Sequence, residues 1–256
     1  MILAIDIGNT NVVMGCFDGD KLIFRERVSS NQEATDLEYA VTIKTALEMY
    51  HITVEEVKGV IVSSVVPSIT NTFKRAVEKL TGVKPAVVGP GIKTGLSILI
   101  DNPAQLGSDL VVDAVAGINE YPLPQIIIDM GTATTFSIID RNRNYLGGMI
   151  TTGMAVSAEA LVSKTSQLPK IAFDKPKKLI GTNTVDCIKS GIMYSTASSL
   201  DGMIERIEDE LGERCTVIAT GGLASLVIPL CKRDIILDED LMLKGLVNIY
   251  NRNYGK

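Results

Sequence analysis

The first half of the chain opens with three short apolar runs and then alternates between strand-like runs and stretches of helical periodicity. Asp18-Gly19, between the second and third runs, is typical of a β-hairpin. We expect strands at residues 2–5, 12–17, 22–28, 59–63 and 86–88, and helices at residues 36–50, 69–80 and 105–118. The positions predicted to form the buried face of the 36–50 helix are Leu37, Ala40, Val41, Ala46 and Leu47.

The second half repeats this order. We expect strands at residues 125–128, 135–139, 145–150, 215–219 and 235–237, and helices at 155–165, 185–211, 223–230 and 239–250. A polar turn at residues 141–144 and Gly221-Gly222 separate some of these elements. Three strands followed by alternating helices and strands, occurring twice, predict two α/β domains packed around a cleft. Pro122 and Pro124 mark the junction, so the predicted domains are residues 1–120 and 121–256.

Composition narrows the class of protein. The chain has 256 residues, of which 46% are hydrophobic and 21% charged, as in an ordinary globular protein. Its formal net charge of -5 argues against nucleic-acid binding, and no apolar run approaches the roughly 20 residues that a membrane span needs. The N-terminus resembles a strand rather than a signal peptide. Four scattered cysteines without a Cys-x-x-Cys pair predict reduced core thiols and a cytoplasmic protein.

The chain has a single histidine, His51, which follows the predicted 36–50 helix and is interpreted as a helix-end residue without a chemical role. Histidine triads and multi-histidine metal sites are therefore excluded. Acid–base chemistry has to come from carboxylates or lysine.

Two similar phrases carry the main chemical information. Asp6-Ile7-Gly8-Asn9-Thr10 and Asp129-Met130-Gly131-Thr132 each place an aspartate at the end of an apolar run, followed by a glycine and small polar residues. Glycine allows a ligand to approach the backbone closely, and free N–H groups can bind phosphate oxygens. An aspartate beside them suits a cation that accompanies phosphates. The pair predicts a nucleotide held between duplicated domains.

A resemblance to a known family adds to this interpretation. Asn102-Pro103-Ala104-Gln105-Leu106-Gly107-Ser108-Asp109 stands between the two turns, and further matching phrases lie at residues 63–67, 147–150, 167–169, 181–184, 201–204 and 219–224. With both turns, the chain resembles the acetate and sugar kinase, Hsp70 and actin superfamily and, from end to end, the type III pantothenate kinases. This resemblance implies two duplicated ribonuclease H-like domains flanking a nucleotide cleft.

The resemblance also implies an activity. Such a kinase transfers the γ-phosphoryl group of ATP to the hydroxyl of pantothenate, giving 4'-phosphopantothenate in the first step of coenzyme A biosynthesis. It implies Mg²⁺ carried with ATP, a monovalent cation such as K⁺ or NH₄⁺, and a cytoplasmic homodimer.

Roles for individual residues follow from the same resemblance. Asp109 matches the general base, Asp129 the monovalent-cation ligand, and Thr132 a contact to ATP. The ATP phosphate loop corresponds to Asp6, Ile7, Gly8, Asn9, Thr10, Asn11, Val12 and Val13, with Asp6 holding Mg²⁺ directly or through water. The pantothenate pocket corresponds to Ile100, Gly107, Ser108, Asp109, Leu110 and Thr184.

Each of these residues also has a purely structural interpretation. The first turn can be an ordinary asparagine-containing hairpin turn, and Asp129 can be satisfied by the N–H groups of its own turn. Asp109 can complement the helix dipole, with Ser108 as the N-cap, and Thr184 can be an N-cap as well. Asp113, one turn after Asp109, is interpreted as structural.

Two positions in the predicted acceptor pocket depart from the family. Leu110 stands where an arginine is common directly after the catalytic aspartate, and Ile100 stands where a tyrosine is common. Residues 148–153 also lack the usual Ala-Pro-Gly ending. Loss of the charge-assisted arginine contact removes about 1.5–3 kcal/mol of binding. Two alternatives therefore stay open: a kinase for another small alcohol, and a catalytically inactive nucleotide-binding regulatory protein.

Overall fold

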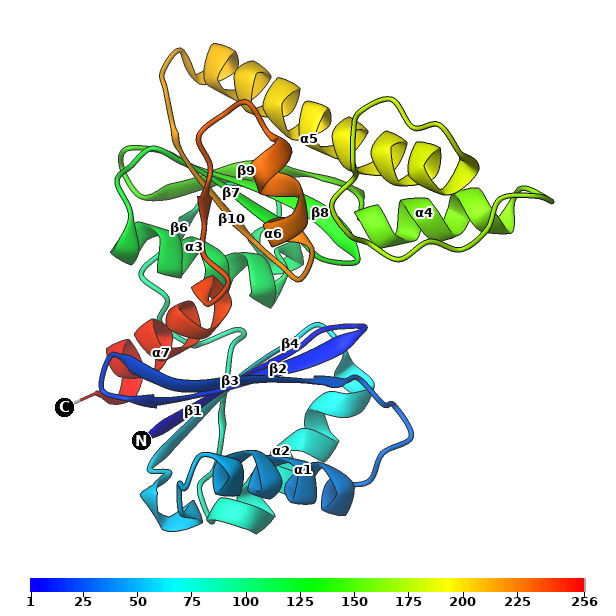
Figure 1. Cartoon of the computed structure of the whole chain (residues 1–256). Helices are drawn as coiled ribbons and strands as arrows, with labels where there is room; N and C mark the ends of the chain where they lie inside the picture. The colour runs from blue at the N-terminus through cyan, green and yellow to red at the C-terminus, as the bar shows by residue number, and fades with distance from the viewer. Residues whose placement is uncertain (256) are drawn as a thin grey trace. The chain divides into compact units, whose positions relative to one another are not determined.

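The computed structural model describes residues 1–255, which form two compact units (Figure 1). The first unit consists of Met1–Leu96, Asp101–Asn119 and the chain from Asp240 onward. The second consists of Ser97–Ile100 and Glu120–Glu239. The predicted division into residues 1–120 and 121–256 therefore needs a correction: the last helix packs on the first sheet, and a short segment before residue 101 joins the second.

The first unit is built on a five-stranded sheet with the order β3-β2-β1-β4-β5. The strands β1, β2 and β3 form an antiparallel meander, and β4 and β5 continue the sheet in parallel with β1. Their bounds are Ile2–Ile7 for β1, Asn11–Asp18 for β2, Lys21–Ser29 for β3, Gly59–Ser64 for β4 and Ala86–Val87 for β5. The predicted hairpin after Asp18 is confirmed, with Gly19 at a positive φ of 59°.

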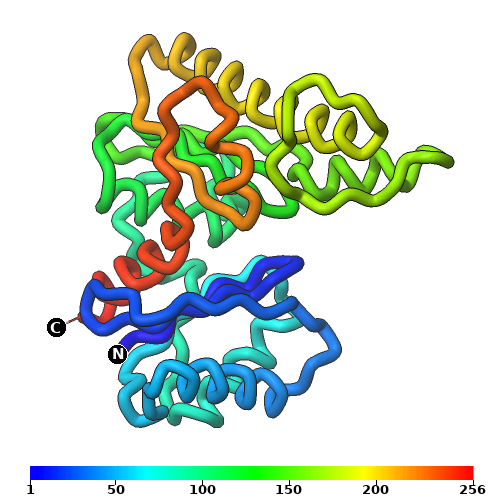
Figure 2. The backbone as a smooth tube through the Cα atoms, in the orientation of Figure 1, coloured from blue at the N-terminus to red at the C-terminus, as the bar shows by residue number. Residues whose placement is uncertain are grey.

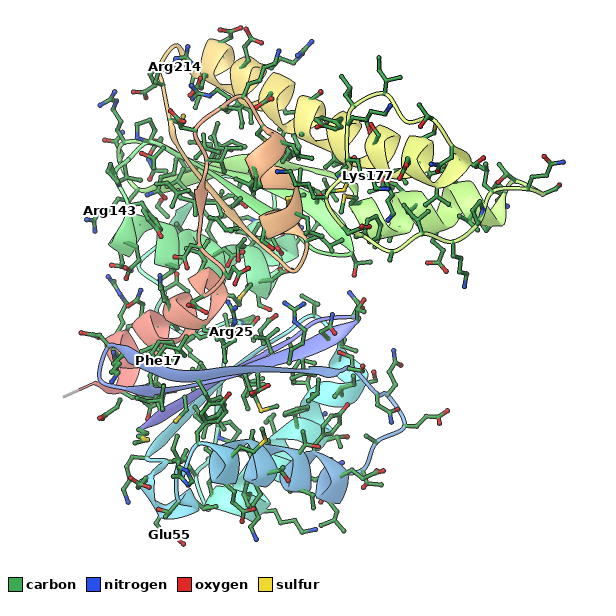
Figure 3. The ribbon with its side chains drawn as sticks, viewed as in Figure 1. Phe17, Arg25, Glu55, Arg143, Lys177 and Arg214 are labelled. Atoms are coloured by element: carbon green, nitrogen blue, oxygen red, sulfur yellow. The ribbon has the colours of Figure 1, made fainter. Side chains whose placement is uncertain are left out.

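Helices cover both faces of this first sheet. On one face, α1 (Asp36–Met49) and α2 (Pro67–Thr81) pack over Leu3, Ile5 and Ile7. On the other face, α7 (Leu241–Tyr254) lies along β1 and β4, so that a late segment of the chain lies beside the first strand (Figure 2). The helix α3 (Ser108–Glu120) also contributes Val112 and Val115 to the apolar cluster on this α7 face of the sheet. Phe17, labelled in Figure 3, belongs to this second cluster too.

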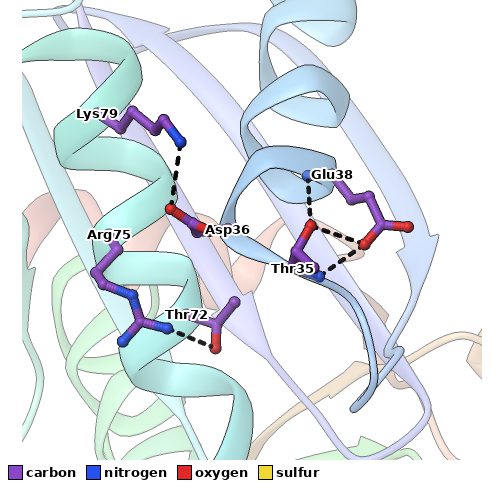
Figure 4. A network of polar contacts seen from close by, with 6 residues as sticks. All are labelled: Thr35, Asp36, Glu38, Thr72, Arg75 and Lys79. Atoms are coloured by element: carbon purple, nitrogen blue, oxygen red, sulfur yellow. Dashed lines mark hydrogen bonds and ion pairs between the residues drawn. The ribbon is translucent and has the colours of Figure 1, made fainter.

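The start of α1 shows why the chain becomes helical there (Figure 4). Thr35 is the N-cap: its hydroxyl accepts the N–H of Glu38, and the Glu38 carboxylate accepts the N–H of Thr35 at 2.7 Å. Asp36 pairs with Lys79 of α2 at 3.5 Å. The predicted buried face of this helix was partly wrong. Leu37 and Val41 are exposed, because the side that meets the sheet and α2 carries Tyr39, Ala40, Ile43, Ala46 and Leu47.

The second unit repeats the first sheet and extends it. Its six strands have the order β11-β10-β7-β8-β9-β6, in which β7, β8 and β9 form the antiparallel meander and β10 and β11 run parallel to β7. Their bounds are Ser97–Ile98 for β6, Gln125–Met130 for β7, Ala133–Ile139 for β8, Asn144–Thr152 for β9, Thr216–Thr220 for β10 and Ile236–Leu237 for β11. The same strand order in both units confirms the predicted duplication.

One face of the second sheet carries α4 (Met154–Ser163), α5 (Thr184–Leu211) and α6 (Ala224–Val227). The apolar cluster between them includes Ile128, Phe136 and Ala219 from three neighbouring strands. Three short 3₁₀ helices lie at Val54–Glu56, Pro103–Gln105 and Ile228–Leu230. Two of them account for differences from the predicted helices. The 3₁₀ helix at Pro103–Gln105 precedes α3, which therefore starts later than residue 105. The helix expected at 223–230 is divided into α6 and the 3₁₀ helix that contains Pro229.

Two further findings concern the composition-based expectations. Among residues 1–255, no helix combines the length and the apolar character needed to cross a membrane. Of the four cysteines, Cys16 is buried and Cys215 and Cys231 are half-buried, but Cys187 is exposed on α5. The prediction of four core thiols was therefore wrong for Cys187, which lies in the first turn of α5 and lines surface hollows there.

Candidate active site

The first Asp-x-Gly turn joins β1 to β2 through Gly8, Asn9 and Thr10. The N–H of Gly8 donates to the carbonyl of Asn11, the first residue of β2, at 3.0 Å. A Cβ on Gly8 would lie 3.1 Å from the same carbonyl, a tight contact that glycine avoids. Asn9 and Thr10 are exposed at the tip. The N–H of Gly8 is thus used inside the turn, and the exposed tip is the part that a ligand can reach.

Ser30, directly after β3, braces this turn and was missed by sequence reasoning. Its hydroxyl donates to the carbonyl of Gly8 at 2.6 Å, and its N–H donates to the carbonyl of Thr10 at 2.9 Å. The hairpin register pairs Ser29 with Asn11 and so places Ser30 beside the turn. This contact depends on the register of β2 with β3, which cannot be read from the sequence.

Asp109 lies in the first turn of α3, as predicted. Its Oδ1 accepts the N–H of Leu110 at 2.9 Å. The carboxylate folds back over Gly107, where a Cβ would overlap Oδ1. Gly107 therefore leaves room for the acidic side chain. Ser108 is not the N-cap that the structural alternative required, because α3 begins at Ser108 and its hydroxyl points to β4.

A chain of hydroxyl groups connects α3 to the end of β4. Ser63 and Ser108 share a hydrogen bond of 3.1 Å between their side-chain oxygens, and the Ser108 hydroxyl lies 3.2 Å from the carbonyl of Ser64. Ser63 is also the in-register neighbour of Asp6, since β1 and β4 are parallel there. The turn that follows Asp6 and the helix that carries Asp109 are thus fastened to the same strand within the first unit.

The close packing of α3 against α7 fixes the rest of the helix. A Cβ on Gly245 of α7 would overlap the carbonyl of Val112, so the two helices meet at backbone distance. Asp113, on the same stretch of α3, is 1% exposed. Its burial agrees with the structural role expected for it.

The predicted acceptor residues are distributed over both units. Gly107, Ser108, Asp109 and Leu110 belong to the first unit, where Leu110 is half-buried, whereas Ile100 belongs to the second. Thr184 also belongs to the second unit and is the first residue of α5. The structure brings the first four together at the start of α3, with Gly107 directly before the helix.

Thr184 is not an N-cap. Asn183 takes that place, because its side chain accepts the N–H of Asp186 at 2.9 Å. Thr184 lines a hollow of about 300 Å³ inside the second unit. The other lining residues are Leu161, Leu168, Cys187, Ile188, Gly191 and Ile192. Thr184 is therefore exposed and available to a ligand or to a partner chain.

The second Asp-x-Gly turn, between β7 and β8, has the same construction as the first. The N–H of Gly131 donates to the carbonyl of Ala133, the first residue of β8, at 3.0 Å. Thr132 is exposed at the tip, and its carbonyl accepts the N–H of Gly153 at 3.0 Å. A Cβ on Gly221 would lie 2.6 Å from the backbone of Met130. Gly153 and Gly221, which follow the strands β9 and β10, thus both lie close to the backbone of this turn.

The donor set fits cations that arrive with phosphates better than a resident metal ion. Within residues 1–255, no group of three or more His, Cys, Asp or Glu side chains could hold a metal. A single carboxylate such as Asp6 is typical of Mg²⁺ sites in which substrate phosphates and water supply the other ligands. Beside Asp129, the buried hydroxyl oxygen of Thr135 lacks a hydrogen-bond partner, so a second oxygen is present there. These oxygens fit a hard monovalent cation.

Comparison with known proteins decides the family. The family model for type III pantothenate kinases matches residues 2–206. A type III pantothenate kinase from Bacillus cytotoxicus is 45% identical over 253 residues, which cover 99% of this chain and 97% of that protein. The chain belongs to the type III pantothenate kinases. The resemblance carried by the paired turns and by the phrase around Asp109 is thereby confirmed.

Solved structures place this pantothenate kinase family member in a wider fold. The activator of 2-hydroxyisocaproyl-CoA dehydratase from Clostridium difficile, with bound ADPNP, covers 98% of this chain and 93% of its own, with a TM-score of 0.60 and 16% identity. A ROK family glucokinase from Streptomyces griseus, in complex with glucose and AMPPNP, covers 100% and 99%, with a TM-score of 0.52 and 14% identity. The fold is therefore the one shared by actin, Hsp70 and sugar kinases, as expected.

Proposed function

We propose that the chain transfers the γ-phosphoryl group of ATP to the hydroxyl of pantothenate, with Asp109 as the general base. The observation that carries this proposal is the position of the Asp109 carboxylate at the start of α3. It lies over Gly107, on a helix fastened by Ser108 to the strand beside Asp6. An acidic side chain held in this way is an acceptor for the proton of a substrate hydroxyl.

The proposed step balances simply. The pantothenate oxygen forms a bond to the γ-phosphorus, the bond between that phosphorus and the β,γ-bridging oxygen breaks, and the hydroxyl proton passes to the Asp109 carboxylate. ADP and 4'-phosphopantothenate leave. Phosphoryl transfer of this kind depends mainly on positioning and on neutralisation of charge. The anchoring of α3 through Ser108 and Gly245 supports the positioning part.

The first turn is proposed to bind the phosphates of ATP. Asn9 and Thr10 form its exposed tip, while Ser30 holds the carbonyls of Gly8 and Thr10 in place. Asp6, at the end of β1, is proposed to orient Mg²⁺ directly or through water. The metal ion, when bound with ATP, neutralises charge on the phosphate oxygens.

The second turn is proposed to serve a monovalent cation and the nucleotide. Asp129 supplies the carboxylate, and Thr132 at the exposed tip contacts ATP. The cation, when bound, adds positive charge beside the phosphates. K⁺ and NH₄⁺ both fit a site with one carboxylate and neutral oxygens.

The acceptor pocket is where a second candidate function has a specific observation in its favour. Leu110 carries no charge next to Asp109, and Ile100 carries no hydroxyl, so neither gives an anionic substrate a charge-assisted contact. A different small alcohol is therefore the alternative acceptor. The side chain of Leu110 is half-buried in the first turn of α3, directly after Asp109.

A homodimer formed by the second unit is also part of the proposal. Leu179 and Ile180 are 61% and 77% exposed, and they line a hollow of about 450 Å³ together with small residues of α5. Small side chains such as Gly191, Ser195 and Ser198 let another helix approach closely, and exposed apolar side chains favour a protein partner. The four unpaired cysteines support a cytoplasmic setting.

The activity is tested by measuring ADP release from ATP in the presence of pantothenate, with K⁺ and then Na⁺ as the cation, beside a panel of other alcohols. Turnover with pantothenate that is lost in Asp109→Asn supports the proposal. Turnover only with another alcohol selects the alternative, and ATP binding without any turnover contradicts both. If pantothenate turns over slowly, Leu110→Arg should increase kcat/KM by about tenfold to a hundredfold.

The dimer is tested by sedimentation of Ile180→Asp beside Leu37→Asp. Both variants place a carboxylate on an exposed apolar position, in the second and the first unit respectively. We expect a dimer for the unsubstituted chain and for Leu37→Asp, and a monomer for Ile180→Asp. A dimer that survives Ile180→Asp contradicts the proposed interface.

A further inference from the structure

A polar row crosses the second sheet at the level of Asp129. In the strand register, Asp129 of β7 lies opposite Thr135 of β8 and opposite Thr220 of β10. Directly paired residues of neighbouring strands point to the same face of a sheet. The face concerned is the one away from α5, because Ile128 and Phe136, which alternate with this row, belong to the α5-side cluster. A carboxylate is thus flanked by two hydroxyl-bearing side chains.

The hydroxyl of Thr135 has no protein partner. Its Oγ1 is buried from solvent and makes no hydrogen bond within the described chain. An unpaired buried hydroxyl costs about 1–3 kcal/mol, and such groups are uncommon in folded proteins. An oxygen that lacks a partner next to a carboxylate has the chemistry of a cation ligand.

The duplicated half of the chain shows what packing alone requires at this place. Asp6 of β1 is flanked in the same way, by Val13 of β2 and Ser63 of β4. Val13 therefore corresponds to Thr135, and valine has nearly the same shape as threonine. In the first half, Val13 places a methyl group beside Asp6. In the second half, Thr135 places a hydroxyl beside Asp129, the proposed cation ligand.

We propose that Thr135 contributes its hydroxyl oxygen, beside the carboxylate of Asp129, to the monovalent-cation site. This inference rests on the proposed function, which puts the cation at Asp129. One carboxylate with neutral protein oxygens beside it matches a single positive charge, whereas Mg²⁺ at a single carboxylate relies on substrate phosphates and water for its other ligands. Thr135 is thus a residue that determines the affinity of the site for the cation, and Val13 shows why the other turn lacks such a site.

Thr134 provides a matched control on the same strand. Its Oγ1 is also buried without a hydrogen-bond partner, and the residue is 1% exposed. In the register it pairs with Met130 and Thr151, so it points to the opposite face and lies beside no carboxylate. Thr134→Val and Thr135→Val remove the same group from adjacent positions, and only the second removes it from the proposed site.

The test is a titration of thermal stability with KCl at constant ionic strength, balanced with tetramethylammonium chloride, with and without ADP. Binding of K⁺ to the folded state raises Tm. We expect Thr135→Val to need about tenfold more K⁺ than the unsubstituted chain for the same rise, as for other residues that support a metal ligand. Thr134→Val and Thr135→Ser should keep the original K⁺ dependence. The K⁺ concentration for half-maximal turnover should move in the same way.

The outcomes separate this inference from the proposed function. If Asp129→Asn abolishes the K⁺ response while Thr135→Val leaves it unchanged, the cation site stands and the role of Thr135 is wrong. If the unsubstituted chain shows no K⁺ response at all, both the cation assignment and the role of Thr135 are wrong. An equal loss in Thr134→Val and Thr135→Val would also overturn the inference, since it would point to general destabilisation of β8.

Discussion

The side-chain oxygens of Ser63 and Ser108 lie 3.1 Å apart and join β4 to the first residue of the helix that carries Asp109. Ser63 is completely buried, and Ser108 also reaches the carbonyl of Ser64 at 3.2 Å. The position of the proposed general base therefore depends on a contact between residues 45 positions apart in the chain.

Removal of either hydroxyl should weaken this connection, but to different degrees. Ser108→Ala leaves the buried Ser63 hydroxyl without its partner, so we expect a loss of about 1–3 kcal/mol in the free energy of unfolding and a lower kcat. Ser63→Ala should cost about 1 kcal/mol, because Ser108 keeps the Ser64 carbonyl. Urea unfolding and steady-state kinetics measure both. Strictly additive losses in the double variant would contradict a direct contact.

Gly107→Ala should separate activity from stability. The added Cβ would overlap Oδ1 of Asp109, which lies at the end of a rotatable side chain and can move away. Gly107 is not among the glycines with a positive φ, so alanine causes no backbone strain there. We expect an unchanged Tm and a decrease in kcat of about a hundredfold, because misplacement of a reacting group by about 1 Å has that effect.

Gly89→Ala is the control for that variant, since a Cβ there meets nothing within 4 Å. It should leave both kcat and Tm close to their original values. Full activity of Gly107→Ala would show that the observed orientation of the Asp109 carboxylate is not the one needed for turnover.

Ser30→Ala should raise the KM for ATP and leave the KM for pantothenate unchanged. The substitution removes the 2.6 Å hydrogen bond to the carbonyl of Gly8 but keeps the backbone contact to Thr10. The KM for ATP should rise about threefold to tenfold, which corresponds to the loss of one hydrogen bond. Ser29→Ala, at the adjacent exposed position, should leave it unchanged. An equal increase in the KM for pantothenate would contradict a specific role in the phosphate turn.

Thiol labelling should distinguish Cys187 from the other cysteines. Burial is the main cause that raises the pKa of Cys16 and of Cys215 to about 11 and that of Cys231 to about 12. The reactive thiolate is therefore scarce at these three positions at neutral pH, and its fraction grows as the pH rises toward those values. Cys187 is exposed. Cys187 also lines the hollow proposed as the dimer interface, so the test uses the Ile180→Asp variant, which is expected to be a monomer. In that variant a disulfide reagent at neutral pH should modify one cysteine rapidly, and Cys187→Ser should abolish this fast phase. A fast phase that persists in Cys187→Ser would contradict the burial of the remaining thiols.

Local patterns were sufficient to predict most elements of both sheets, because each strand and helix carries its own apolar periodicity. The two Asp-x-Gly turns were also visible, since the residues of each are contiguous. The orientation of α1 could not be predicted. Leu37 and Val41 fit a helical stripe, but which side of the helix is buried depends on the packing of Tyr39 and Ile43 in the cluster that includes Phe73 of α2. Likewise, β6 pairs over only two residues with β9, too few for any periodicity.

The support of the candidate site could not be predicted for a related reason. Ser30, Ser63 and Ser108 are unremarkable serines in the sequence, and each acts through a partner that the fold brings close. The in-register neighbours of Asp129 also depend on the pairing of β7 with β8 and β10. Sequence reasoning proposed which side chains carry the chemistry, but the residues that hold them depend on strand register.

The packing of α7 on β1 and β4 has a consequence for synthesis on the ribosome. Leu243, Leu246 and Ile249 complete the apolar cluster that contains Ala4 and Ile61. The ribosome adds these helix residues only after it has synthesised residues 97–239, most of which form the second unit. The face of the first sheet that α7 covers therefore stays uncovered while the second unit is translated. We therefore expect the α1 and α2 face of the first sheet to acquire its core early, and the opposite face, on which α3 and α7 pack, to become native last.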